Sequence, residues 1–192
     1  FLSVLPSLLP RTIAGIPEKE SAAFFFMFLA FYFFISAWKS KTNFSRYSFS
    51  FLSALATAAM SLIWGGSPYV FITISGAVFI SFLFNQVNLH KFYTFSIWLF
   101  PSYFIPLLFS SRYTLNGILT STISGLTIAV FAIILFHLLF FRYFEKYFEN
   151  SKLSKIPKPL LSTLLVIIIV GIAGSAVFGL DFVTHKIGDI TK

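Results

Sequence analysis

The sequence predicts an all-α integral membrane protein, a polytopic bundle of helices, and three observations support this class. Of the 192 residues, 57% are hydrophobic and only 10% are charged. The mean hydropathy is +0.88, whereas a soluble domain has about a quarter of its residues charged. The apolar residues gather in stretches of about twenty, which is the length that crosses a bilayer as a helix.

Six stretches are predicted to span the membrane as helices, because a span must satisfy its own backbone hydrogen bonds. Within the fourth stretch, Pro101 and Pro106 predict a kink or a break. Two glycines of the sixth stretch, Gly171 and Gly174, allow a close approach of another helix. The six stretches cover residues 21–38, 48–64, 69–86, 92–110, 117–141 and 159–180.

The basic residues predict how these spans are oriented. Alternate connections carry unequal numbers of Lys and Arg, and the richer side is expected in the cytoplasm. The net charge of +8 is therefore attributed to membrane orientation, and nucleic-acid binding is not expected. The richer side holds Lys39, Lys41, Arg46, Lys91, Arg142, Lys146, Lys152, Lys155 and Lys158, and the other side holds Arg11, Lys19, Arg112, Lys186 and Lys192.

A polar segment at residues 11–20, RTIAGIPEKE, is the first candidate for chemistry. The chain has only six acidic residues, and Glu18 and Glu20 lie here at the predicted outer end of the first span. Pro17 suits the first turn of a helix, where the macrodipole favours negative charge. Such a pair of carboxylates can bind a divalent cation if further ligands come from elsewhere, and Arg11 can pair with a carboxylate or a phosphate. The same pattern also fits a charged interfacial cap without chemistry.

Three other polar features occur along the chain. Arg112 lies in a predicted external loop, where it can meet an anionic headgroup. Trp64-Gly65-Gly66 is typical of an interfacial turn. His137, in the middle of a predicted span, is expected to be a packed, hydrogen-bonded histidine. No thiolate site is possible, because the sequence contains no cysteine.

The order of these motifs resembles the catalytic subunit of oligosaccharyltransferase, most closely its archaeal forms. Arg11-Thr12-x-Ala14-Gly15 is followed at the family spacing by Glu18 and Glu20. Further on, the segment SLIWGGSPYVF, residues 61–71, is similar to the family's Ser-x-Trp-Gly-Gly-Tyr-x-Phe stretch. The family usually has Asp at the position of Glu18. The resemblance implies an internal fragment of a GT-C-type transmembrane domain, and these 192 residues are expected to be inactive alone.

The resemblance further implies transfer of a glycan from a dolichyl-phosphate-type lipid carrier to Asn in Asn-x-Ser/Thr, that is, protein N-glycosylation. Glu18 and Glu20 are then the implied ligands of Mn²⁺ or Mg²⁺, and Arg11 lies near the catalytic site. We assign Arg11 and Arg112, as a hypothesis, to the lipid phosphate. The expected partners are the lipid-linked oligosaccharide, the acceptor polypeptide and the bilayer. The expected location is a cell membrane, multi-pass, with the acidic segment on the extracytoplasmic face.

Two further classes stay open at the level of sequence. One is another membrane glycosyltransferase that uses lipid-linked sugars. The other is a polytopic transporter or a structural membrane subunit. A transporter predicts ionisable residues inside the spans, and His137 is nearly the only such residue.

Overall fold

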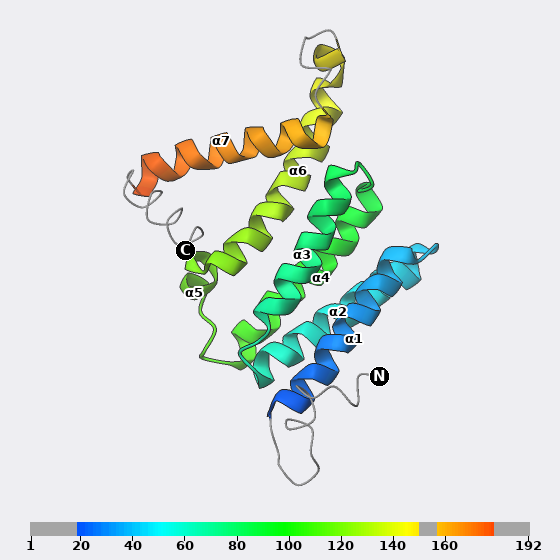
Figure 1. The fold of residues 1–192 in the computed structure, drawn as a ribbon, viewed down its shortest axis with the longest axis vertical. Coiled ribbons are helices and arrows are strands. Elements are labelled where there is room, and N and C mark those ends of the chain that lie inside the picture. The colour runs from blue at the N-terminus through cyan, green and yellow to red at the C-terminus, as the bar shows by residue number, and fades with distance from the viewer. Residues whose placement is uncertain (1–18, 150–156, 179–192) are drawn as a thin grey trace, which may run out of the picture. The chain divides into compact units, whose positions relative to one another are not determined.

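The computed structural model describes residues 19–149 and 157–178, and all regular structure in them is helical. The predicted all-α class is therefore confirmed, and no strand occurs in these two ranges. The helices are α1 (Lys19–Lys39), α2 (Asn43–Ile63), α3 (Pro68–Leu83), α4 (Leu89–Phe109), α5 (Leu115–Thr120), α6 (Thr122–Glu149) and α7 (Lys158–Phe178), as Figure 1 shows.

Among the described residues, three helical segments are long and apolar enough to cross a membrane: α1, α4 and Thr122–Phe141 of α6. Two apolar helical segments are shorter, Pro68–Leu83 and Lys158–Ile169. These segments support a multi-pass membrane protein. Each of the six predicted stretches overlaps a helix of the structure, and the number of actual crossings stays a prediction.

Helix α2 packs against both α1 and α4, and small polar side chains make the close contacts. The hydroxyl of Ser53 donates to the backbone oxygen of Ala30 at 2.8 Å. The hydroxyl of Ser50 donates to the backbone oxygen of Thr94 at 2.6 Å. Small residues let helix backbones approach closely, and their hydroxyls bond across the interface. This explains why α2 is less apolar than its neighbours.

Trp98 of α4 forms the centre of this bundle and is fully buried. Its indole N–H donates to the hydroxyl of Thr57 at 3.1 Å. The rings of Phe34 and Phe71 each lie 5.6 Å from the Trp98 ring, so α1 and α3 also contact this residue. Helix α4 continues through Pro101 and Pro106, so the break allowed by the sequence does not occur.

The chain divides into two compact units. The first contains α1, α2, α4, α5, most of α3 and the beginning of α6, and the second contains Phe82–Gln86 and the chain from Ala132 onward. In the second unit, Nδ1 of His137 lies 2.7 Å from the hydroxyl of Ser162. The prediction that His137 is packed and hydrogen-bonded is confirmed.

Candidate functional site

The candidate site lies in the first unit, at the end where α1 begins. Glu20 is in the first turn of α1 and is partly buried. A carboxylate at this position is stabilised by the helix macrodipole, as the sequence suggested. Arg11 and Glu18, the other residues predicted for this site, lie outside the described residues.

A metal centre was predicted at Glu18 and Glu20, and the described residues provide one carboxylate of that pair. Nowhere in the described part of the chain do three His, Cys, Asp or Glu side chains gather in a way that could hold a metal ion. Divalent Mg²⁺ and Ca²⁺ take about six or more oxygen ligands. Glu20 by itself does not meet that requirement, so the metal centre stays a prediction.

The turn Trp64-Gly65-Gly66 links α2 to α3 and is fixed by its own tryptophan. The backbone N–H of Trp64 donates to the oxygen of Met60 at 2.9 Å, which ends α2. The indole ring then covers Gly66, where an added Cβ would overlap the ring carbons. Gly66 is therefore required by the close packing of Trp64, which is a structural reason for a glycine in this motif.

The same tryptophan connects this turn to α1. The rings of Trp64 and Phe24 lie 5.7 Å apart with an angle of 59° between their planes. Phe24 is four residues after Glu20, so both project from one face of α1. The acidic segment and the Trp-Gly-Gly motif are 44 residues apart when counted from Glu20 to Trp64. The fold places Glu20 and Trp64 at the same end of the bundle.

Arg112 comes to this end from the connection between α4 and α5. Its Nη2 lies 2.8 Å from the position that a Cβ on Gly65 would occupy, so the guanidinium group rests against the Gly65 backbone. The neighbouring Tyr113 donates its hydroxyl to the backbone oxygen of Ser61 at 2.8 Å. This hydrogen bond fastens the Arg112 loop to the last turn of α2.

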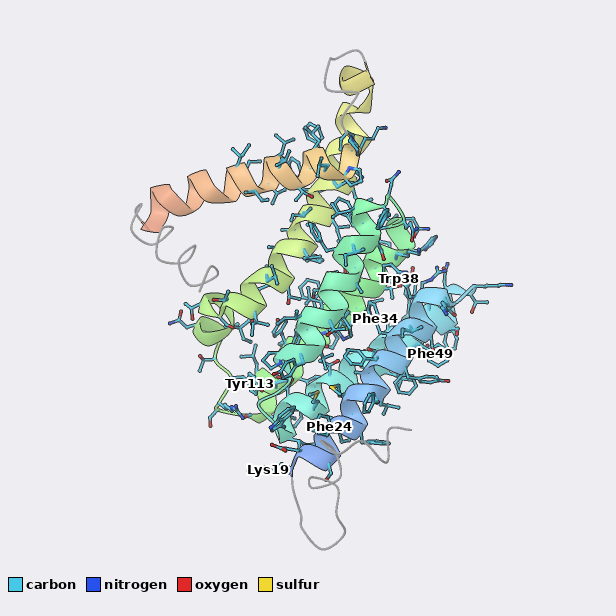
Figure 2. The ribbon with its side chains drawn as sticks, in the orientation of Figure 1. Lys19, Phe24, Phe34, Trp38, Phe49 and Tyr113 are labelled. Carbon is cyan, nitrogen blue, oxygen red and sulfur yellow. The ribbon has the colours of Figure 1, made fainter. Side chains whose placement is uncertain are left out.

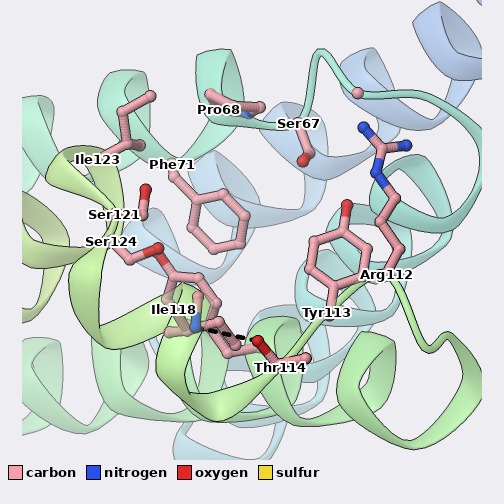
Figure 3. A pocket seen from close by; sticks show the side chains of 13 residues that line it. Ser67, Pro68, Phe71, Arg112, Tyr113, Thr114, Ile118, Ser121, Ile123 and Ser124 are labelled. Atoms are coloured by element: carbon pink, nitrogen blue, oxygen red, sulfur yellow. Dashed lines mark hydrogen bonds between the residues drawn. The ribbon is translucent and has the colours of Figure 1, made fainter.

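A pocket of about 260 Å³ opens beside Arg112, and its lining combines hydroxyl groups with apolar side chains. Figure 3 shows the Arg112 guanidinium on one side of the pocket and Ser121 and Ser124 on the other. Phe71 and Tyr103 stack with ring centroids 4.4 Å apart and form an aromatic wall. The residues that line it are Gly65, Ser67, Pro68, Phe71, Tyr103, Arg112, Tyr113, Thr114, Gly117, Ile118, Ser121, Ile123 and Ser124.

The chemistry of this pocket follows from its lining. Among the described residues that line it, Arg112 is the one that carries a charge, and none is a carboxylate or an imidazole. A guanidinium group beside several hydroxyls suits an anion such as a phosphate, because it donates two parallel hydrogen bonds in a fixed geometry.

Sequence reasoning found Arg112 and the Trp-Gly-Gly turn but missed most of the pocket. Ser67 and Tyr113, which are direct neighbours of these motifs, line it. Ser121 directly precedes α6, and Ser124 lies in its first turn. Nothing in their sequence context distinguishes these two serines from the other serines of the chain. Their place in the pocket depends on the fold, which brings the start of α6 beside the start of α3.

Together, the fold and this site define a multi-pass helical membrane protein with a pocket beside Arg112, at the end of the bundle where α1 begins. The family model described as "Oligosaccharyl transferase STT3, N-terminal" matches residues 1–182. The chain belongs to this family. Comparisons with curated proteins and with solved structures gave no match.

Proposed function

We propose that this protein takes part, within a larger enzyme, in the transfer of an oligosaccharide from a dolichyl-phosphate-type lipid to Asn in Asn-x-Ser/Thr. Membership of an oligosaccharyl transferase family supports this function. The observation that carries it is the meeting of Trp64, Arg112 and the first turns of α1 at one end of the bundle. This end is also the one that the basic residues predict to face outward.

Arg112 is proposed to bind the phosphate of the lipid carrier. During transfer, a bond forms between the amide nitrogen and the sugar carbon, and the bond from that carbon to the phosphate oxygen breaks. The electron pair leaves with the phosphate, and the amide proton passes to a base. A guanidinium group placed at the pocket wall stabilises the charge that develops on the departing phosphate.

The carboxylates of Glu18 and Glu20, with Arg11 close by, are proposed to form the catalytic side of the site. Mn²⁺ or Mg²⁺ is the proposed cofactor, and its other ligands lie outside the described residues. Such an ion supplies a fixed positive charge that organises acidic side chains. An amide nitrogen is a poor nucleophile, so the contribution of Glu20 is to hold and orient it.

The test uses the full-length protein in membranes, a lipid-linked oligosaccharide and an Asn-x-Thr peptide. We expect a glycopeptide, and none with the matched peptide in which Asn is replaced by Gln. Transfer of the sugar to a lipid, or to another sugar, and never to the peptide contradicts the proposal. That result favours the alternative class, a different membrane glycosyltransferase that uses lipid-linked sugars.

A further inference from the structure

A second pocket lies between α1 and α3, at the end of α1 opposite to Glu20. Its volume is about 260 Å³, which is below the range of roughly 300–1,000 Å³ for sites that enclose a drug-sized ligand. We name it the α1–α3 groove. The residues that line it are Phe34, Ile35, Trp38, Lys39, Ala77, Val78 and Ser81.

The walls of the α1–α3 groove are apolar. Phe34 and Trp38 stack with ring centroids 5.8 Å apart and form the wall on α1; both are labelled in Figure 2. Ala77 and Val78 face them from α3. The one hydroxyl on this side, that of Ser81, donates to the backbone oxygen of Ala77 at 2.9 Å. Because that hydroxyl is satisfied within its own helix, the groove suits a hydrocarbon chain.

An exposed apolar stripe on α1 leads into the groove. Phe25, Phe28, Tyr32 and Ile35 follow one another at spacings of three and four residues, and each side chain is more than 40% exposed. This spacing places them along one face of the helix. Because α1 is long and apolar enough to span a membrane, such a face is the surface that meets lipid. The stripe ends at Lys39, the last residue of α1.

Two lysines lie near Trp38, at one end of the groove. Lys39 lines it and is exposed. The Nζ of Lys91, from the first turn of α4, lies 4.9 Å from the centre of the Trp38 ring. No acidic residue is among the residues that line the groove. Its chemistry is therefore an apolar channel that ends at two positive charges and an indole ring, which matches a lipid tail with an anionic headgroup.

We propose that the α1–α3 groove binds an anionic phospholipid of the bilayer, with one acyl chain against Phe34, Val78 and Ala77 and the phosphate between Lys39 and Lys91. The occupant is a resident lipid, distinct from the lipid-linked sugar of the proposed function. The ammonium groups attract the headgroup as point charges. The indole of Trp38 lies at the level of the headgroups, where tryptophan is enriched in membrane proteins.

The test is native mass spectrometry of the full-length protein in detergent, titrated with phosphatidylglycerol or with phosphatidylcholine. We expect tighter binding of phosphatidylglycerol. Lys39→Gln and Lys91→Gln should each weaken that binding about fivefold, as the loss of one basic group near an anionic headgroup implies. Ala77→Phe should fill the groove and abolish binding of both lipids. Lys41→Gln is the matched control, because Lys41 is exposed and does not line the groove.

Three results would overturn the proposal. The first is equal affinity for the two lipids. The second is the same loss in Lys41→Gln as in Lys39→Gln, which indicates diffuse attraction rather than a site. The third is a photo-crosslink from Ile35 to a protein segment instead of a lipid. If Ala77→Phe fails to fold, the two lysine variants decide the question, provided that their melting temperatures equal that of the unchanged protein.

Discussion

Two pockets of the first unit have the same volume, about 260 Å³ each, but differ in the polar groups that line them. The pocket at the end where α1 begins is lined by Arg112, by hydroxyl groups and by apolar side chains such as Phe71. The α1–α3 groove, at the other end of the same helix, is lined by apolar side chains and Lys39. A tryptophan packs beside each pocket. Trp64 lies in the turn after α2, and Trp38 lies near the end of α1.

The two pockets differ in the type of their cation and in how firmly that cation is held. The Arg112 guanidinium is placed against Gly65 and beside a loop fixed by Tyr113. A forked donor held in this way can select the geometry of a phosphate. Lys39 is an exposed lysine at the end of an apolar helix face, where a flexible point charge is sufficient for a lipid headgroup.

The largest effect is expected at the catalytic carboxylates. Glu18→Gln removes a proposed metal ligand, so transfer to an Asn-x-Thr peptide should fall by about 100-fold or more, since loss of a supporting outer-shell group alone costs about 10- to 100-fold. Added Mn²⁺ should restore part of the activity. Lys41→Gln is the control and should keep full activity. Full activity of Glu18→Gln at every Mn²⁺ concentration would show that Glu18 is not a ligand.

The next largest effect is expected for a substitution of Gly66. Gly66→Ala forces a methyl group into the Trp64 ring, and overpacking of this kind costs about 1–3 kcal/mol. Gly76→Ala in α3 is the matched control, because an added Cβ there meets nothing within 4 Å and Ala favours a helix by about 1 kcal/mol. Thermal unfolding in detergent measures both. Equal melting temperatures would contradict the packing described for Trp64.

The neighbouring Gly65→Ala tests the position of Arg112 rather than stability. The new methyl group meets the far end of the flexible Arg112 side chain at 2.8 Å, so the guanidinium is expected to move while the fold persists. We predict a lower affinity for the lipid-linked donor, by about tenfold, as for loss of one hydrogen bond to a charged group. The measurement is donor-dependent transfer together with thermal unfolding. A stable variant with unchanged donor dependence would refute this placement.

The smallest effect should be Lys91→Arg in the α1–α3 groove. Arginine keeps the positive charge and also stacks on an indole ring. Binding of phosphatidylglycerol should therefore change by less than about twofold, unlike in Lys91→Gln. Native mass spectrometry of the two variants gives the comparison directly. A large loss in Lys91→Arg would mean that the groove, like the Arg112 pocket, depends on the geometry of its donor.

The sequence predicted the helical class and the approximate positions of the helices, because a long run of apolar residues is a local feature of the chain. It also predicted a packed His137, because a single polar residue inside such a run needs a hydrogen-bond partner. It also pointed to Arg112 as a candidate for binding an anionic headgroup and to Trp64-Gly65-Gly66 as a turn. It did not predict that Trp64 contacts Phe24, or that Arg112 rests on Gly65. These contacts join residues that are far apart in the chain, and no local pattern encodes them.

The prolines of α4 are a second case in which the local sequence was not sufficient to predict the structure. Pro101 and Pro106 allowed a break, but the helix continues through both. Around them, Trp98 and Ser102 are buried, and the Ser102 hydroxyl donates to the backbone oxygen of Trp98 at 2.7 Å. Tertiary packing supports a helix that proline would weaken in isolation.

The central claim is that Arg112 holds the phosphate of the lipid-linked donor beside the Trp64-Gly65-Gly66 turn. The most direct test compares unchanged protein, Arg112→Lys and Arg112→Gln for transfer at varied donor and varied peptide concentrations. We predict that the KM for the donor rises by about tenfold or more in Arg112→Gln, and less in Arg112→Lys, while the KM for the peptide stays unchanged. An unchanged donor KM in Arg112→Gln would contradict the account.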